Sequence, residues 1–264
     1  MFPVLPIINV IFSSLNVHAR QNFARATFQF VILFQPILLS FLLYMMLRGS
    51  NPVHAGEYIV VSSGLMNLWS SIIFSSAGDI DRERYMGTLE CIYVSPSDFR
   101  LIFLGHVLGN LLLGLFSMVL SSICVVFLFG LQVHIENPAE FLCAFTLSIL
   151  SFTAISLLIG LIFTLSRSAR ILMNCLEYPI YILCGLVFPI SVLPKALQFI
   201  AYVLSPTWAA QLLRESMAGI QNIRIFYFDL IALSILILVY FLLTIVLFKK
   251  IDRRVRIDGT LGVH

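Results

Sequence analysis

The sequence has 264 residues, of which 60% are hydrophobic and 11% are charged, and its formal net charge is +3. Soluble domains are about half apolar and about a quarter charged, so this composition excludes an ordinary soluble domain and indicates an integral membrane protein. We expect no nucleic-acid partner, because the sequence has neither a basic patch interleaved with polar residues nor a matching motif.

The first predicted element is an amphipathic helix at about residues 7–25. Its apolar residues recur at helical spacing and are Ile8, Phe12, Leu15, Ala19 and Phe23. A helix of this kind is typical of a segment that lies in the plane of the membrane interface, here on the cytoplasmic side. The alternative is a frayed N-terminal tail.

Six stretches of the sequence have the length and apolar character of transmembrane helices, which need about 20 residues. They lie at about 28–47, 58–77, 101–130, 139–165, 171–190 and 228–248. The third and fourth are longer than a bilayer requires, so we expect them to tilt or protrude. These spans predict an all-α integral membrane fold in which residues 1–264 form a single transmembrane domain.

The distribution of Lys and Arg predicts the orientation of these spans, because cytoplasmic loops carry an excess of positive residues. With both termini in the cytoplasm, twelve of the 16 Lys and Arg residues lie inside. The four outside are Arg48, Lys195, Arg214 and Arg224. We therefore expect a multi-pass protein of the cell membrane with both termini cytoplasmic.

Residues 191–219, before the last span, are predicted to form short outward-facing helices that re-enter the membrane. The apolar run 196–213 could be a seventh span, but that would place the basic segment 249–256 outside. Pro194 and Pro206 also interrupt the run. Irregular backbone at membrane depth is tolerated where protein shields it, so we favour two short helices.

A charged segment, "DIDRERYMGTLE" at residues 79–90, separates the second and third spans, and seven of its twelve residues are ionisable. We predict a short cytoplasmic helix at about 81–94, which ends before Pro96 because a residue preceding proline avoids the α region. One face of this helix is apolar and consists of Tyr85, Leu89 and Ile92. Another face holds Glu83, Gly87 and Glu90. The alternative is a solvated loop that only satisfies the charge rule.

Two stretches resemble ABC-2 type transporter permeases. "RERYMGTLECIYVSP" (82–96) resembles their cytoplasmic loop, in which an E-x-x-x-G-T-L-E pattern precedes Ser-Pro. Residues 185–219 resemble the end of the family's fifth span and the outward-facing short helices that follow. The six spans, cytoplasmic termini and N-terminal interface helix agree with this resemblance.

The resemblance implies that the charged segment carries a coupling helix that docks on a separate ABC ATP-binding subunit. The residues implied in this ATPase-coupling interface are Arg82, Glu83, Arg84, Gly87, Thr88, Leu89 and Glu90. The N-terminal helix would brace the same interface. The sequence has no G-x-x-x-x-G-K-[ST] loop, so we expect ATP and Mg²⁺ to be bound by the partner and no cofactor by this chain.

Neither a catalytic nor a metal site is predicted, because the five histidines show no HExxH motif and no metal-ligand spacing. The candidate pathway residues are Gln35, Asn67 and Glu177. An intramembrane carboxylate such as Glu177 is a functional hypothesis by default, although it could instead pair with Arg167 or Arg170. Gly105 and Gly109 form a G-x-x-x-G pattern that favours close helix packing, either within the subunit or between two subunits.

These observations predict the permease subunit of an ATP-driven exporter, which is not itself an enzyme. It would form the pathway as a dimer with a second copy of itself or with a paralogous permease. The expected substrate is a hydrophobic or amphiphilic compound such as a drug, lipid or peptide. The alternatives are a permease that exports polysaccharide or lipid-linked glycan, and a non-ABC membrane transporter or scaffold.

Overall fold

The computed structural model of the chain describes residues 4–24, 26–48, 55–87, 99–165 and 169–258. All regular secondary structure in these ranges is helical. The helices are α1 (Val4–Phe23), α2 (Ala26–Leu47), α3 (Ala55–Tyr85), α5 (Phe99–Phe129), α6 (Pro138–Leu165), α7 (Ala169–Leu183), η1 (Ile190–Val192), α8 (Lys195–Val203), α9 (Ser205–Ala218) and α10 (Ile223–Asp258). The observed α1 agrees with the helix expected at 7–25 and excludes the alternative of a frayed tail there.

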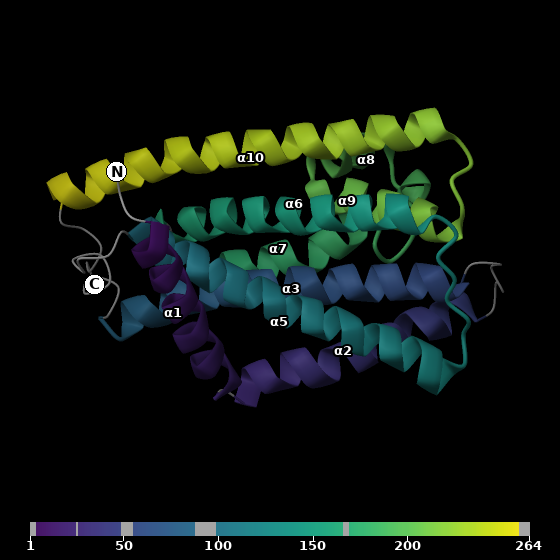
Figure 1. The fold of residues 1–264 in the computed structure, drawn as a ribbon, viewed down its shortest axis with the longest axis horizontal. Helices are drawn as coiled ribbons and strands as arrows, with labels where there is room; N and C mark the ends of the chain where they lie inside the picture. Colours follow the sequence, from purple (N-terminus) through teal and green to yellow (C-terminus); the bar gives the residue numbers. More distant parts are fainter. Residues whose placement is uncertain (1–3, 25, 49–54, 88–98, 166–168, 259–264) are drawn as a thin grey trace.

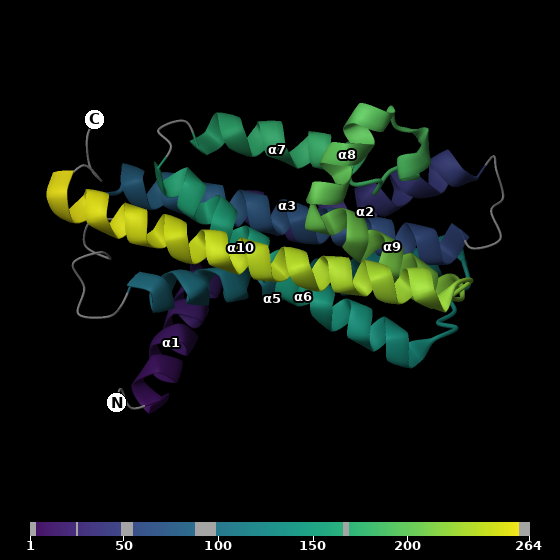
Figure 2. The same cartoon turned by 90° about the horizontal axis from the view of Figure 1, so that it is seen from above.

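The long helices form a bundle whose axis is horizontal in Figure 1, where α3, α5, α6 and α10 run side by side. Helix α1 instead runs across one end of the bundle in both views (Figures 1 and 2). The start of α1, the end of α3 and the end of α10 all lie toward this end. The orientation of α1 is the one expected of a helix that lies in the plane of a membrane interface.

Helix α3 is the centre of the bundle. It packs against α2, α5, α6, α7 and α9, and every residue from 59 to 73 is buried. Protein therefore surrounds this stretch on all sides. A helix enclosed in this way can carry polar side chains that bond to neighbouring helices, which accounts for the serines in this part of the sequence.

In the described part of the chain, four helices are long and apolar enough to cross a membrane by themselves. Their apolar segments are Gln29–Leu47, Arg100–Phe129, Pro138–Thr164 and Ile223–Lys250. These segments confirm that the spans predicted at 28–47, 101–130, 139–165 and 228–248 are membrane-capable helices. Helices α8 and α9 meet at 89° and form either one broken span or a re-entrant loop, so the outward-facing re-entrant placement stays a prediction.

The other two predicted spans differ from the expectation. Residues 58–77 are helical but belong to the longer α3, which is not among the helices that are apolar enough to span alone. The span predicted at 171–190 is wrong as a single helix, because α7 ends at Leu183 after 15 residues. At about 1.5 Å per residue, α7 is roughly 22 Å long, shorter than a hydrocarbon core of about 30 Å.

A Schellman motif ends α7. Gly185 has a φ of 68°, and the N–H groups of Gly185 and Leu186 donate to the carbonyls of Ile182 and Tyr181. These two bonds satisfy carbonyls that the helix end leaves without intrahelical donors. A Cβ at Gly185 would lie 2.6 Å from Ile190 Cγ1, so glycine is required there for both conformation and space.

The start of the helix predicted at 81–94 is also corrected. Residues 81–85 continue α3, and Met86 and Gly87 form a turn in which Gly87 has a φ of 68°. The chain has no proline between the predicted second span and Tyr85, so nothing forces α3 to end where its apolar part ends. Gly87 in the left-handed region then stops the helix. Residues 88–94 lie outside the described part.

Candidate functional site

A carboxyl group lies buried where α2, α3 and α7 meet. Glu177 on α7 is 1% exposed. The hydroxyl of Ser70 on α3 donates to Glu177 Oε1 at 2.7 Å, and Gln35 Nε2 on α2 donates to Ser70 Oγ at 2.9 Å. The Tyr181 hydroxyl lies 3.4 Å from the same Oε1. We call Gln35, Ser70, Glu177 and Tyr181 the polar cluster.

The polar cluster fastens α7 to α3 but leaves one acceptor unmatched. The Tyr181 hydroxyl also donates to the carbonyl of Met66 at 3.2 Å. Glu177 Oε2 is buried and has no hydrogen-bond partner. Because the side chains of Arg167 and Arg170 are not among those the structure describes, an ion pair of Glu177 with either stays a prediction.

Two of the three predicted pathway residues, Gln35 and Glu177, thus belong to one cluster. The third, Asn67, is 2% exposed and lies on α3 three residues before Ser70. Its amide nitrogen donates at 2.8 Å to the carbonyl of Ser63 on its own helix, whereas its Oδ1 has no partner. Asn67 is therefore near the polar cluster in sequence but is not bonded to it.

Helix α1 packs on the G-x-x-x-G pattern of α5, and we call this contact surface the seat of α1. A Cβ added to Gly105 would lie 2.8 Å from the carbonyl oxygen of Ile11, and one added to Gly109 would lie 3.4 Å from His18 Cδ2. The two helices can approach this closely only because both positions lack a side chain. Of the two alternatives, packing within the subunit is the one observed.

Polar contacts fasten α1 to this seat. The Ser14 hydroxyl donates to the carbonyl of Ile102 at 2.9 Å. His18 Nε2 lies 2.8 Å from Asn110 Oδ1, to which Asn22 Nδ2 also donates at 3.1 Å. His18 and Asn22 are buried, and the ring of His106 stacks on that of His18 with centroids 4.3 Å apart.

The apolar residues of α1 are divided between protein and the outside. Phe12 is 66% exposed and Phe23 is 47% exposed, whereas Leu15 is half-buried against Gly109. The side of α1 that packs on α5 thus includes Ser14, His18 and Asn22, and the exposed phenylalanines suit a membrane boundary.

At the other end of the bundle, Arg214 on α9 joins three segments. Its Nη2 donates to Ser62 Oγ at 2.8 Å and to the carbonyl of Leu186 at 3.2 Å. Its guanidinium carbon lies 3.9 Å from the ring centroid of Tyr58, a cation–π contact. Arg214 therefore ties α9 to α3 and to the segment after α7.

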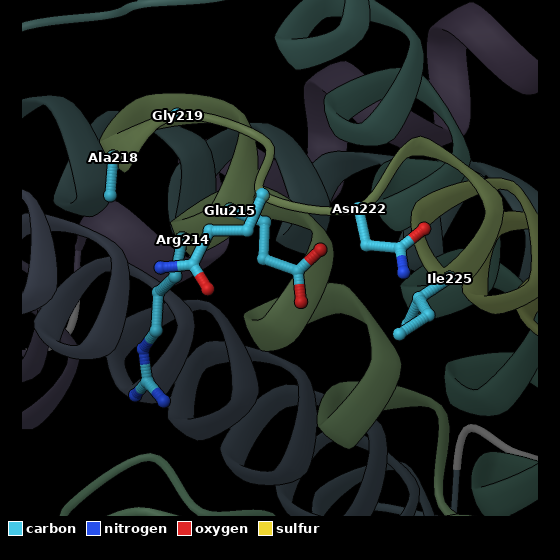
Figure 3. A pocket seen from close by; sticks show the side chains of 7 residues that line it. Arg214, Glu215, Ala218, Gly219, Asn222 and Ile225 are labelled. Carbon is cyan, nitrogen blue, oxygen red and sulfur yellow. The ribbon is translucent and has the colours of Figure 1, made fainter.

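A cavity of about 390 Å³ lies beside this contact. It is lined by Arg214, Glu215, Ala218, Gly219, Gln221, Asn222 and Ile225. The carboxyl of Glu215 and the amide of Asn222 extend on the side of the cavity, whereas the guanidinium of Arg214 points away from both (Figure 3). Polar and apolar side chains therefore line the cavity together, and none of the labelled side chains directs a cation into it.

The family model for the ABC-2 type transporter matches residues 12–218, well over half of the sequence. The chain belongs to the ABC-2 type transporter family. This permease is thus a multi-pass membrane protein and the transport subunit of an ABC transporter. None of the curated proteins matches it significantly. The family match includes the polar cluster, the seat of α1 and the Arg214 contact.

The predicted ATPase-coupling residues of the permease lie at and beyond the end of α3. Arg82, Glu83 and Arg84 are in its last turn, and Gly87 is in the following turn. Glu83 is partly buried. Thr88, Leu89 and Glu90 lie outside the described residues, so the coupling interface stays a prediction.

Several residues that the sequence analysis did not single out make buried or half-buried side-chain contacts in the structure of the permease. They are Ser70, Tyr181, His18, Asn22, Asn110 and Arg214. The spacing of Ser14, His18 and Asn22 at every fourth position is a signal for a polar helix face. Asn110 is four residues after His106, so α5 has a matching polar pair.

Proposed function

We propose that this permease is the membrane subunit of an ATP-driven exporter that couples to a separate ABC ATP-binding subunit. Two permease subunits, identical or paralogous, together form the translocation pathway. The observation that carries the proposal is the continuity of α3, which runs as one 31-residue helix from Ala55 to Tyr85. At about 1.5 Å per residue, it is roughly 46 Å long.

Continuity makes α3 a mechanical link between the charged segment and the interior. Glu83 lies in the last turn of α3, Ser70 bonds Glu177 more than three turns earlier, and Ser62 bonds Arg214 further along. Rigid elements with packed side chains carry energetic coupling between distant sites. A displacement of the α3 end by the ATP-binding subunit therefore reaches both contacts.

Helix α1 supports the proposed docking region from the other side. The charged segment leads into α5, which begins at Phe99. Helix α1 packs on the first part of α5 through Gly105 and Asn110. Movement of the segment between α3 and α5 is thereby transmitted to α1, which fits the bracing role proposed for it.

The same proposal accounts for localisation and cofactors. The ends of α3 and α10 and the start of α1 share one end of the bundle (Figure 1), and α10 carries Lys249 and Lys250 toward that end. The positive-inside rule makes this the cytoplasmic side of a cell membrane. ATP and Mg²⁺ are then bound by the partner, on that side.

The proposed substrate is a hydrophobic or amphiphilic compound. The predicted pathway residues lie among apolar and aromatic side chains, and Glu177 is their single ionisable carboxyl group. Long polar chains such as polysaccharides need many hydrogen-bonding and aromatic contacts along a wide route. A small set of polar groups in an apolar setting instead suits a compound with one polar end.

Co-purification tests the coupling part of the proposal. A tagged permease is expected to retain its ATP-binding subunit and to stimulate ATP hydrolysis, and the double variant Glu83→Lys with Glu90→Lys is expected to lose both. Glu215→Lys is the matched control, because Glu215 lies on α9 at the other end of the bundle. An unchanged complex and unchanged stimulation in the double variant would refute the coupling role.

A further inference from the structure

We propose that Glu177 binds the protonated amine of an amphiphilic substrate, so that the preferred substrates of this permease are organic cations with an N–H group. The inference rests on the proposed export function and names the chemical class that its pathway recognises. It starts from the two oxygen atoms of one carboxyl group, which differ in their surroundings.

Glu177 Oε1 is supplied with donors, whereas Oε2 is not. Ser70 donates to Oε1, and the Tyr181 hydroxyl lies within 3.4 Å of the same atom. Oε2 is buried without a hydrogen-bond partner. A buried acceptor left unmatched costs free energy, so a ligand that donates to Oε2 makes a hydrogen bond that no protein group makes to that atom.

None of the described side chains that bond Glu177 carries a positive charge. They are the hydroxyl of Ser70, the phenol of Tyr181 and, through Ser70, the amide of Gln35. Arg214 is occupied by Ser62, Leu186 and the ring of Tyr58. A carboxylate at membrane depth is costly unless it is paired. An ammonium group supplies the countercharge and the missing N–H together, as a charge-assisted hydrogen bond.

Aromatic rings beside the carboxyl group favour the same ligand. The rings of Tyr178 and Tyr181 meet edge to face with centroids 6.1 Å apart, and both residues lie within one turn of Glu177. Faces of aromatic rings attract ammonium groups and also pack on alkyl chains. A cation with an apolar tail therefore matches the chemistry around Glu177 better than a neutral polar compound does.

Access to Glu177 requires only that α7 move relative to α3. The main neighbours of α7 are α3 and α8, and α7 runs along the edge of the bundle in Figure 2. Its outer face is exposed at Tyr178, Pro179 and Ile182. Pro179 has no N–H for the helical bond to residue 175, which weakens α7 next to Glu177.

The link to the coupling segment is direct. The bonds that close α7 over the carboxyl group end on Ser70 and on the carbonyl of Met66, both on α3. A shift of α3 would strain these bonds first. In this arrangement, the movement that the ATP-binding subunit applies to α3 opens and closes the amine site.

The test is equilibrium binding of N,N-dimethyldodecylamine to the full-length permease in lipid nanodiscs, with binding to empty nanodiscs subtracted. We expect Glu177→Gln to weaken this binding roughly 10- to 100-fold, the range for loss of a hydrogen bond to a charged group. Dodecan-1-ol has the same chain without the charge, and its binding is expected to be equal in both proteins. Glu215→Gln is the matched control and keeps wild-type affinity for the amine.

Equal affinity of wild type and Glu177→Gln for the amine overturns the proposal, as does an equal loss for dodecan-1-ol. If Glu177→Gln does not purify as a folded protein, the wild type decides: the amine has to bind at least about tenfold tighter than the alcohol, and equal binding refutes the site. The assay uses neither ATP nor a partner. A negative result for amine binding therefore does not contradict the coupling proposal, and a negative co-purification result does not contradict the amine site.

Discussion

At the scale of single residues, the contact between α1 and α5 depends on shared acceptors in a buried place. Asn110 is 1% exposed, and its Oδ1 serves both His18 and Asn22. Buried polar groups are expensive when one partner is removed, because the remaining groups keep their desolvation cost. The stability of this contact is therefore concentrated in one side chain.

We predict that Asn110→Ala destabilises the permease by roughly 1–3 kcal/mol, because the buried Asn22 amide loses an acceptor and the buried His18 ring loses a hydrogen-bond partner. The measurement is the free energy of unfolding, or the midpoint of thermal unfolding, in a fixed detergent. Asn16→Ala is the matched control, since Asn16 is an exposed asparagine on the partner helix α1 and its change is expected to stay within about 0.5 kcal/mol. Equal stability of the two variants would contradict the importance of the contact.

At the scale of elements, α3 combines properties that usually belong to different helices. It is buried on all sides like a core helix, bonds α7 and α9 through serines, and ends in the charged segment. Helix α2, which packs on α3, and helix α10, which packs on α6 and α9, have long exposed apolar faces instead. A displacement of α3 therefore alters polar contacts to α2, α7 and α9 at once.

We predict that Ala77→Pro uncouples the two ends of α3, because proline removes a backbone bond and distorts the helix at a cost of about 3 kcal/mol. Ala77 lies between the buried stretch and Glu83. A fluorophore on Gln221→Cys, next to the outer cavity, is expected to respond to ATP in the complex with the ATP-binding subunit. In Ala77→Pro the complex is retained and this response is lost.

The control for this experiment is Ala77→Leu, which changes the same position but keeps a good helix former. It is expected to retain the fluorescence response. A wild-type response in Ala77→Pro would mean that the coupling motion does not pass along α3.

At the scale of the whole molecule, the arrangement of the helices separates the end that carries Lys249 and Lys250 from the end that carries Arg214. Lys249 and Lys250 near the end of α10 lie far along the helix from its start at Ile223. The Arg214 contact and the cavity beside it lie at the opposite end, where α9 leads into α10. Orientation in the membrane is therefore testable with one residue from each end.

We predict that a membrane-impermeant maleimide labels Gln221→Cys on intact cells but does not label Lys250→Cys, in proteins whose native cysteines are replaced by serine. Both native positions are exposed on the protein, so the difference reports the side of the membrane. Labelling of Lys250→Cys after the cells are opened is the control for reactivity. The reverse pattern would invert the proposed topology.

The sequence by itself indicated an integral membrane protein and the ABC-2 resemblance, and it predicted six spans, of which four are confirmed as membrane-capable helices. These properties are local, because about 20 apolar residues form a membrane helix whatever surrounds them, and the E-x-x-x-G-T-L-E pattern is contiguous. The short helices after α7 are also local, since Pro194 and Pro206 interrupt the apolar run. Glu177 was a candidate from its apolar context alone.

The tertiary structure decided which faces meet. Helical periodicity shows that His18 and Asn22 share one face of α1, but it does not show that this face meets Asn110 on α5. Periodicity also does not show that Gln35 on α2 and Ser70 on α3 lie next to Glu177 on α7. The length of α3 and the end of α7 at Leu183 also depend on the residues that pack around them. Burial removes the need for apolar residues on every face of α3, and Gly185 ends α7 where Ile190 packs against it.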